Sequence, residues 1–212
     1  MSLAAAWLLL CAFPAPAAPA LDAVPPATEP GLKVSRDGIP PAPSKSQGRI
    51  EALWARGTWV LEKGDPNVAL HLFSAALALD DRRARSWNYL GGAHFMLGDL
   101  PRALQDFNRA LELDPRDVRA CNNLGTTLER LGEYSRAEQA YLRAESTDPV
   151  YPLTQRTLGI LQSQRLGNLP AARRAWQRYL ELAPNGAYAA EIRRELDALP
   201  AAPPLSAPDS VR

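Results

Sequence analysis

The residues in this chain that could do covalent or acid–base chemistry are few and scattered. His71 and His94 are the only histidines, and Cys11 and Cys121 are the only cysteines. No cysteine and histidine stand at the spacing of a nucleophile and its base, and no Cys or carboxylate completes a metal-ligand spacing with the histidines. No G-x-S-x-G elbow, phosphate-binding loop or H-E-x-x-H motif occurs. We therefore predict no enzyme activity, no cofactor and no bound metal.

The residues that could recognise another molecule are amides, arginines and large aromatic side chains. An asparagine amide can pair with both the N–H and the C=O of a peptide backbone. An arginine can hold a carboxylate through two parallel hydrogen bonds, and Trp or Phe can anchor an apolar side chain. We predict that such residues bind a polypeptide segment, with a solvated face as the alternative. The candidates are Trp54, Thr58, Arg85, Asn88, Phe95, Arg119, Asn122, Asn123, Thr126 and Arg156.

These candidates recur with the period of an internal repeat. Three series keep a step of 34 residues: Gly57, Gly91, Gly125 and Gly159; Ala69, Ala103 and Ala137; Phe73, Phe107 and Tyr141. The period defines four units, 50–83, 84–117, 118–151 and a longer 152–186. A period in this range indicates a repeat protein.

Residues 84–117 carry the clearest copy, with Trp87-x-x-Leu90-Gly91 followed by Ala103, Phe107, Ala110 and Pro115. This order closely resembles the tetratricopeptide repeat, a helix–turn–helix unit. The resemblance implies an all-α fold, a right-handed α–α superhelix of four helical hairpins plus a C-terminal capping helix. Close approach of two helices requires a nearly absent side chain, so the repeated glycine and alanine are expected at the crossing, with the aromatic ring beside them.

In the resembled family, one stripe of each first helix lines a concave groove that holds a peptide. When each unit is counted so that its glycine is position 8, the stripe is positions 2, 5, 9 and 12. The candidates above occupy it, with Asn123 at position 6. Some members bind chaperone C-termini through Lys and Asn at fixed groove positions. Trp54, Thr58 and Gly92 do not match that set, and we do not predict that partner.

Several single residues have specific expectations. His94 is predicted to be a packed, hydrogen-bonded core histidine, and Cys121 a small buried core residue. Unit 4 has one extra residue between Gly159 and Gly167, and we favour a longer turn over a bulge in the helix. Residues 187–199 predict the capping helix. Its apolar face carries Tyr188, Ile192, Leu196 and Leu199.

The N-terminal 20 residues predict a signal peptide. Leu3–Phe13 is uncharged and apolar, too short to span a bilayer, and followed by Ala18-Pro19-Ala20 as a cleavage site. No Lys or Arg precedes the run. Cys11 offers an alternative, a lipidated envelope protein, although Leu10 is not the small residue that the lipoprotein pattern expects. We predict a periplasmic or secreted protein, or a cytoplasmic one if the signal is not functional.

The remaining segments complete the domain plan. Residues 21–43, rich in Pro and Ala, predict a disordered linker, and 200–212 a disordered tail. The repeat domain spans 44–199 and begins at a capping box, Ser44-x-x-Gln47. A net charge of +1, from 24 basic and 23 acidic residues and without a clustered Lys/Arg patch on one face, argues against nucleic acid.

The predicted function is a non-catalytic adaptor or scaffold that binds a protein or peptide segment in its groove, in the bacterial cell envelope. The alternative is a structural assembly factor, self-associating or a pilotin-like lipoprotein, of an envelope secretion or pilus complex. A membrane is expected to be reached only through an N-terminal anchor.

Overall fold

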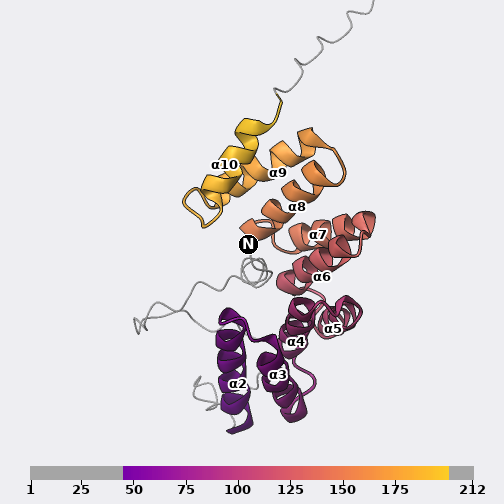
Figure 1. Cartoon of the computed structure of the whole chain (residues 1–212), viewed down its shortest axis with the longest axis vertical. Helices are drawn as coiled ribbons and strands as arrows, with labels where there is room; N and C mark the ends of the chain where they lie inside the picture. The colour runs from indigo at the N-terminus through magenta and orange to yellow at the C-terminus, as the bar shows by residue number, and fades with distance from the viewer. Residues whose placement is uncertain (1–44, 201–212) are drawn as a thin grey trace, which may run out of the picture. The chain divides into compact units, whose positions relative to one another are not determined.

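A computed structural model describes residues 45–200 of the chain (Figure 1). These residues form nine helices and no strand. The chain divides into two compact units, Met1–Leu113 and Asp114–Arg212, and each is treated on its own below. The predicted signal peptide with Cys11, the linker, Ser44 of the capping box and residues 201–212 of the tail all lie outside the described residues.

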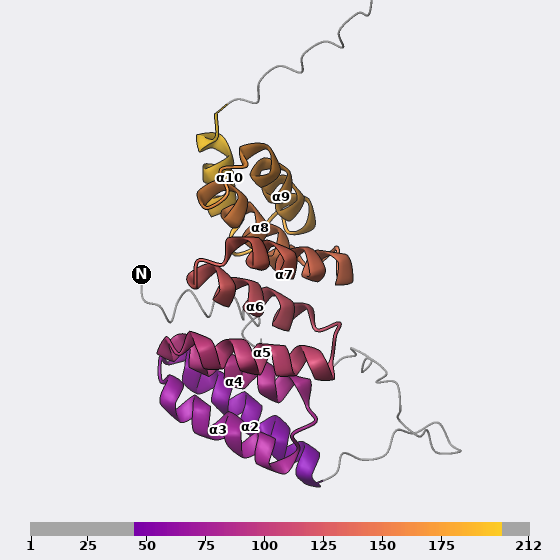
Figure 2. The same ribbon diagram turned by 90° about the vertical axis from the view of Figure 1, so that its right-hand side faces the viewer.

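The first unit holds α2 (Lys45–Glu62), α3 (Pro66–Leu79), α4 (Ala84–Leu97) and α5 (Leu100–Leu113). Helix α2 packs on α3, α3 on α4 and α4 on α5, so neighbours in sequence are neighbours in space (Figure 2). The pairs α2–α3 and α4–α5 are the hairpins predicted from the first two repeats.

The second unit holds α6 (Val118–Arg130), α7 (Tyr134–Thr147), α8 (Pro152–Gln164), α9 (Leu169–Leu182) and α10 (Ala189–Ala198). Helices α6–α7 and α8–α9 form hairpins, α7 packs on α8, and α10 packs on α9. The all-α prediction and the pairing of consecutive helices are thus confirmed. Helix α10 stands where the capping helix was expected.

Local sequence determines where the helices begin and end. Helix α3 starts at Pro66, whose missing N–H costs nothing there, and the Asp65 carboxylate accepts the N–H of Val68. Helix α4 ends at Gly98, whose φ of 81° favours glycine. Four residues join α8 to α9, whereas three join α6 to α7. The extra residue of the fourth repeat therefore lies in the turn, as predicted.

Each hairpin closes on a contact between a glycine and an aromatic ring. A Cβ added at Gly125 would lie 2.5 Å from the Tyr141 ring, and one at Gly91 would lie 2.8 Å from the Phe107 ring. Corresponding contacts join Gly57 to Phe73 and Gly159 to Trp176. The repeated alanines Ala69, Ala103 and Ala137, with Ala172 in the fourth hairpin, are fully buried. A glycine recurs at this position because the aromatic ring fills the space that a Cβ would need.

We predict that Gly125→Ala lowers the free energy of unfolding by about 1–3 kcal/mol, because the new methyl group overlaps the Tyr141 ring. Gly48→Ala is the control: no atom lies within 4 Å of its added Cβ, and it should stabilise helix α2 by about 0.5–1 kcal/mol. Urea unfolding followed by circular dichroism measures both. Wild-type stability in Gly125→Ala would contradict the packing described.

Candidate functional site

The ten candidate residues lie on α2, α4, α6 and α8, the first helices of the four hairpins. Arg85 and Arg119 are exposed, and Thr58, Thr126 and Arg156 are partly buried. The other five are buried: Trp54, Asn88, Phe95, Asn122 and Asn123. Half of the predicted groove residues therefore have little surface to offer a ligand.

Asn122 joins two first helices within the second unit. Its side-chain nitrogen donates to the Thr154 hydroxyl at 2.8 Å and to the Val118 carbonyl at 3.1 Å. Its side-chain oxygen accepts the Thr157 hydroxyl at 3.3 Å. With 2% of its surface exposed, Asn122 uses its amide to hold α6 against α8. We predicted this amide for a peptide backbone; the structure pairs it with hydroxyl groups of the next hairpin.

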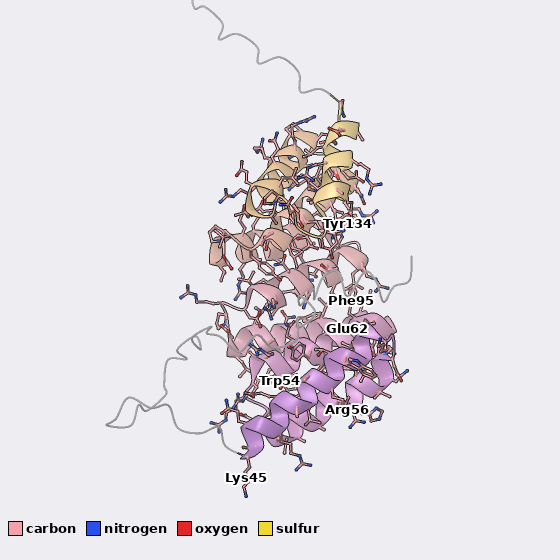
Figure 3. The ribbon with its side chains drawn as sticks, turned by 90° about the vertical axis from the view of Figure 1, so that its left-hand side faces the viewer. Lys45, Trp54, Arg56, Glu62, Phe95 and Tyr134 are labelled. Atoms are coloured by element: carbon pink, nitrogen blue, oxygen red, sulfur yellow. The ribbon has the colours of Figure 1, made fainter. Side chains whose placement is uncertain are left out.

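Trp54, at the equivalent position of the first hairpin, does the same in the first unit. Its indole N–H donates to the Ser86 hydroxyl at 2.9 Å, so α2 is tied to α4. The ring lies edge-on to Tyr89 at 5.9 Å, and the Arg85 guanidinium lies over it at 5.3 Å. Figure 3 shows Trp54 on α2. Only 8% exposed, it acts as a contact between hairpins and not as an open anchor.

Arg156 holds the same position in the fourth hairpin and joins α8 to the capping region. One guanidinium nitrogen donates to Glu191 at 3.0 Å, and the guanidinium carbon lies 4.2 Å from the centre of the Tyr188 ring. The side chain is 12% exposed, and its Nε is buried without a hydrogen-bond partner among residues 45–200. Sequence reasoning did not connect Arg156 to Tyr188 and Glu191, because the capping segment lies outside the repeat period.

A second polar cluster forms where Tyr141 reaches from α7 to the side of α6. The hydroxyl groups of Tyr141 and Thr126 are 3.0 Å apart, and Tyr141 also donates to Glu129 at 3.3 Å. Arg165 lies 3.6 Å from the other oxygen of Glu129. Burial raises the pKa of the Glu129 carboxyl, although Tyr141 and Arg165 act in the opposite direction. Burial also raises the pKa of Tyr141, which therefore stays a neutral donor.

Six side chains at positions 2, 9 and 12 of α6 and α8 remain at least partly open to solvent. We call them the α6–α8 face: Arg119, Thr126, Glu129, Leu153, Ile160 and Ser163. This face carries a positive charge, a carboxylate, two hydroxyl groups and two aliphatic groups. Thr126 and Glu129 are held in place from below by Tyr141. Such a surface can bind a polypeptide through polar and apolar contacts together.

Of the histidines and cysteine in the described residues, His94 and Cys121 lie in the core, whereas His71 is exposed on α3. His94 is 9% exposed, and its Nδ1 lies 2.6 Å from the Asp106 carboxylate, which confirms the predicted hydrogen-bonded core histidine. Cys121 is fully buried, as predicted, and burial raises the pKa of its thiol. Among residues 45–200, no three His, Cys, Asp or Glu side chains are grouped so that they could hold a metal ion. None of the helices in that range is long and apolar enough to cross a membrane.

We predict that Asn122→Ala lowers the free energy of unfolding by about 1–3 kcal/mol, because it leaves the buried Thr154 hydroxyl without its partner. Asn108→Ala is the matched control, since Asn108 is exposed on α5 and its replacement should change stability by less than about 0.5 kcal/mol. Urea unfolding compares them. Equal stabilities of the two variants would show that the Asn122 contacts contribute nothing to the stack.

Comparison with known proteins agrees with this architecture. A family model described as tetratricopeptide repeat matches residues 55–118 and 97–152. No curated protein sequence matches the chain.

Three solved structures share its fold. The crystal structure of MamA is 25% identical, covers 66% of this chain and 82% of its own, and has a TM-score of 0.56. The pilF protein of Pseudomonas aeruginosa is 24% identical over 71% of this chain and 68% of its own, with a TM-score of 0.64. The TPR domain of Arabidopsis OM64 is 21% identical over 56% of this chain and 98% of its own, with a TM-score of 0.52. The family match identifies residues 55–152 as tetratricopeptide repeats, and the fourth hairpin, α8–α9, closes on the same kind of contact between a glycine and an aromatic ring.

Proposed function

We propose that this chain is a non-catalytic adaptor that holds a polypeptide segment on the α6–α8 face. The observation that carries the proposal is the cluster in which the Tyr141 hydroxyl fixes Thr126 and Glu129 on the side of α6. Side chains that are already ordered lose little entropy when a ligand binds, so such a surface favours binding. The tetratricopeptide fold supports a protein-interaction scaffold.

The chemistry of this face suits a peptide in particular. The Thr126 hydroxyl and the Glu129 carboxylate can accept backbone N–H groups, while Arg119 can hold a carboxylate. Ile160, partly open on α8, offers an apolar contact. The proposed site is narrower than the predicted groove, because Asn122 and Trp54 are already used between hairpins.

A peptide selected from a random displayed library on the purified chain supplies a defined ligand. We expect Arg119→Ala/Ile160→Ser to raise the dissociation constant for this peptide about 10- to 30-fold, since each lost contact contributes about 1 kcal/mol. The control is Arg136→Ala/Arg174→Ala, which removes two exposed arginines from α7 and α9. Calorimetric titration measures binding, and unfolding midpoints verify that both variants are folded. Equal affinities for both variants would refute the α6–α8 face.

We also propose that the protein is exported, on the strength of the apolar run Leu3–Phe13 and the Ala18-Pro19-Ala20 site that follows it. Expression in a bacterial host should yield a mature form beginning at Leu21. Leu9→Arg should block this processing, because a charge interrupts the apolar run. Intact-mass spectrometry of cell fractions reads the outcome. A chain retaining Met1 would contradict export, and a lipid on Cys11 as the new N-terminus would replace cleavage after Ala20.

A further inference from the structure

The outer side of α2 differs from the same side of the other first helices. Positions 3, 7 and 10 of α4 are Ser86, Leu90 and Ala93, and those of α8 are Thr154, Leu158 and Leu161; all six are buried under neighbouring helices. In α2 the equivalent residues are Ala52, Arg56 and Trp59, and all three are exposed. Trp59 has 58% of its surface in solvent. This side of α2 is therefore open where its counterparts are covered.

Four positive charges and a tryptophan share that open side. At about 100° per residue, six exposed residues fall within roughly 80° of one another on the helix. We call them the α2 stripe: Lys45, Arg49, Ala52, Arg56, Trp59 and, directly after the helix, Lys63. The Lys63 amine lies 5.7 Å from the centre of the Trp59 ring. Figure 3 looks onto α2, with Lys45 at its beginning. The prediction that no face clusters Lys and Arg is therefore wrong for α2.

The charge of the α2 stripe is not neutralised within the described residues. None of its four cations forms an ion pair there, although Glu51 and Glu62 flank the stripe on the same helix. Some exposed arginines of other hairpins are paired: Arg109 lies 2.7 Å from Glu112, and Arg178 lies 2.8 Å from Glu181. The stripe consequently presents a local positive field to whatever approaches it.

An apolar covering helix does not suit this surface. Arg56 stands where α4 has Leu90 and α8 has Leu158, so a helix docked as in the other hairpins would bury a guanidinium group without a partner. A surface with negative groups avoids that penalty. Tryptophan beside lysine and arginine also matches the interfacial region of a bilayer, where the indole sits at the level of the headgroups.

We propose that the α2 stripe docks the folded domain on an anionic phospholipid surface, with α2 lying along it. Each cation close to such a surface strengthens binding about fivefold, and the attraction decreases with salt. In the sequence, the stripe begins at Lys45, after the predicted linker 21–43 that follows the segment for which the sequence predicts export or lipidation. A single acyl chain anchors weakly, and a basic patch supplies the second attachment. This inference does not depend on the α6–α8 face.

The test is co-sedimentation of the full chain with vesicles of phosphatidylcholine containing about one-third phosphatidylglycerol. We expect Arg49→Gln/Arg56→Gln to weaken partitioning about 25-fold. Trp59→Ser should weaken it as well, without a change in net charge. The control Arg109→Gln/Arg178→Gln removes the same charge from α5 and α9 and should stay within about twofold of wild type. All variants should keep the wild-type unfolding midpoint and affinity for the selected peptide.

Three outcomes would overturn the inference. If the stripe and control variants lost vesicle binding equally, the binding would depend on net charge or on the N-terminal segment and not on the α2 stripe. Equal binding to vesicles with and without phosphatidylglycerol would exclude charge recognition. Binding to duplex DNA without binding to the anionic vesicles would assign the stripe to a nucleic acid.

Discussion

The contact between a glycine and an aromatic ring at the crossing of each hairpin is the constraint on which the rest of the structure depends. Because the ring of Tyr141 occupies the space of a Cβ on Gly125, α6 and α7 can pack this closely only with a glycine at position 125. That packing determines which side of α6 stays open. It also carries the Tyr141 hydroxyl to Thr126 and Glu129, which the phenylalanines of the first two hairpins cannot do.

The second recurring interaction ties one hairpin to the next. Trp54 donates to Ser86, and Asn122 donates to Thr154, and the partners are 32 positions apart in each case. The two side chains differ in size and chemistry, yet both supply an N–H to a hydroxyl group at position 3 of the following hairpin. A polar residue on a first helix can thus stabilise the packing of its unit instead of binding a ligand.

The fold was largely predictable because packing imposes a period. Gly91, Phe107 and the other repeated residues predicted the hairpins, and the spacing of Gly159 and Gly167 predicted the longer turn. The helical period also predicts on which side of a helix a residue lies, but it does not predict how close the next helix comes to that side. The sequence therefore placed Asn122 on a particular side of α6 without showing that α8 covers it. The net charge of the chain did not indicate the α2 stripe, because it sums the charges of all residues. The seven-residue spacing of Arg49, Arg56 and Lys63 was nevertheless present in the sequence.

The way α8 meets the capping region limits how the array could be lengthened. Arg156 stands where Asn122 stands one hairpin earlier, and it spans to Glu191 and Tyr188 instead of to a hydroxyl group. A further hairpin inserted after α9 would separate Arg156 from Glu191 and Tyr188. The Arg156 guanidinium group would then be buried against a helix that does not supply these partners. An engineered array would therefore tolerate an additional hairpin between the third and fourth hairpins. The fourth hairpin, by contrast, has to stay next to the capping helix.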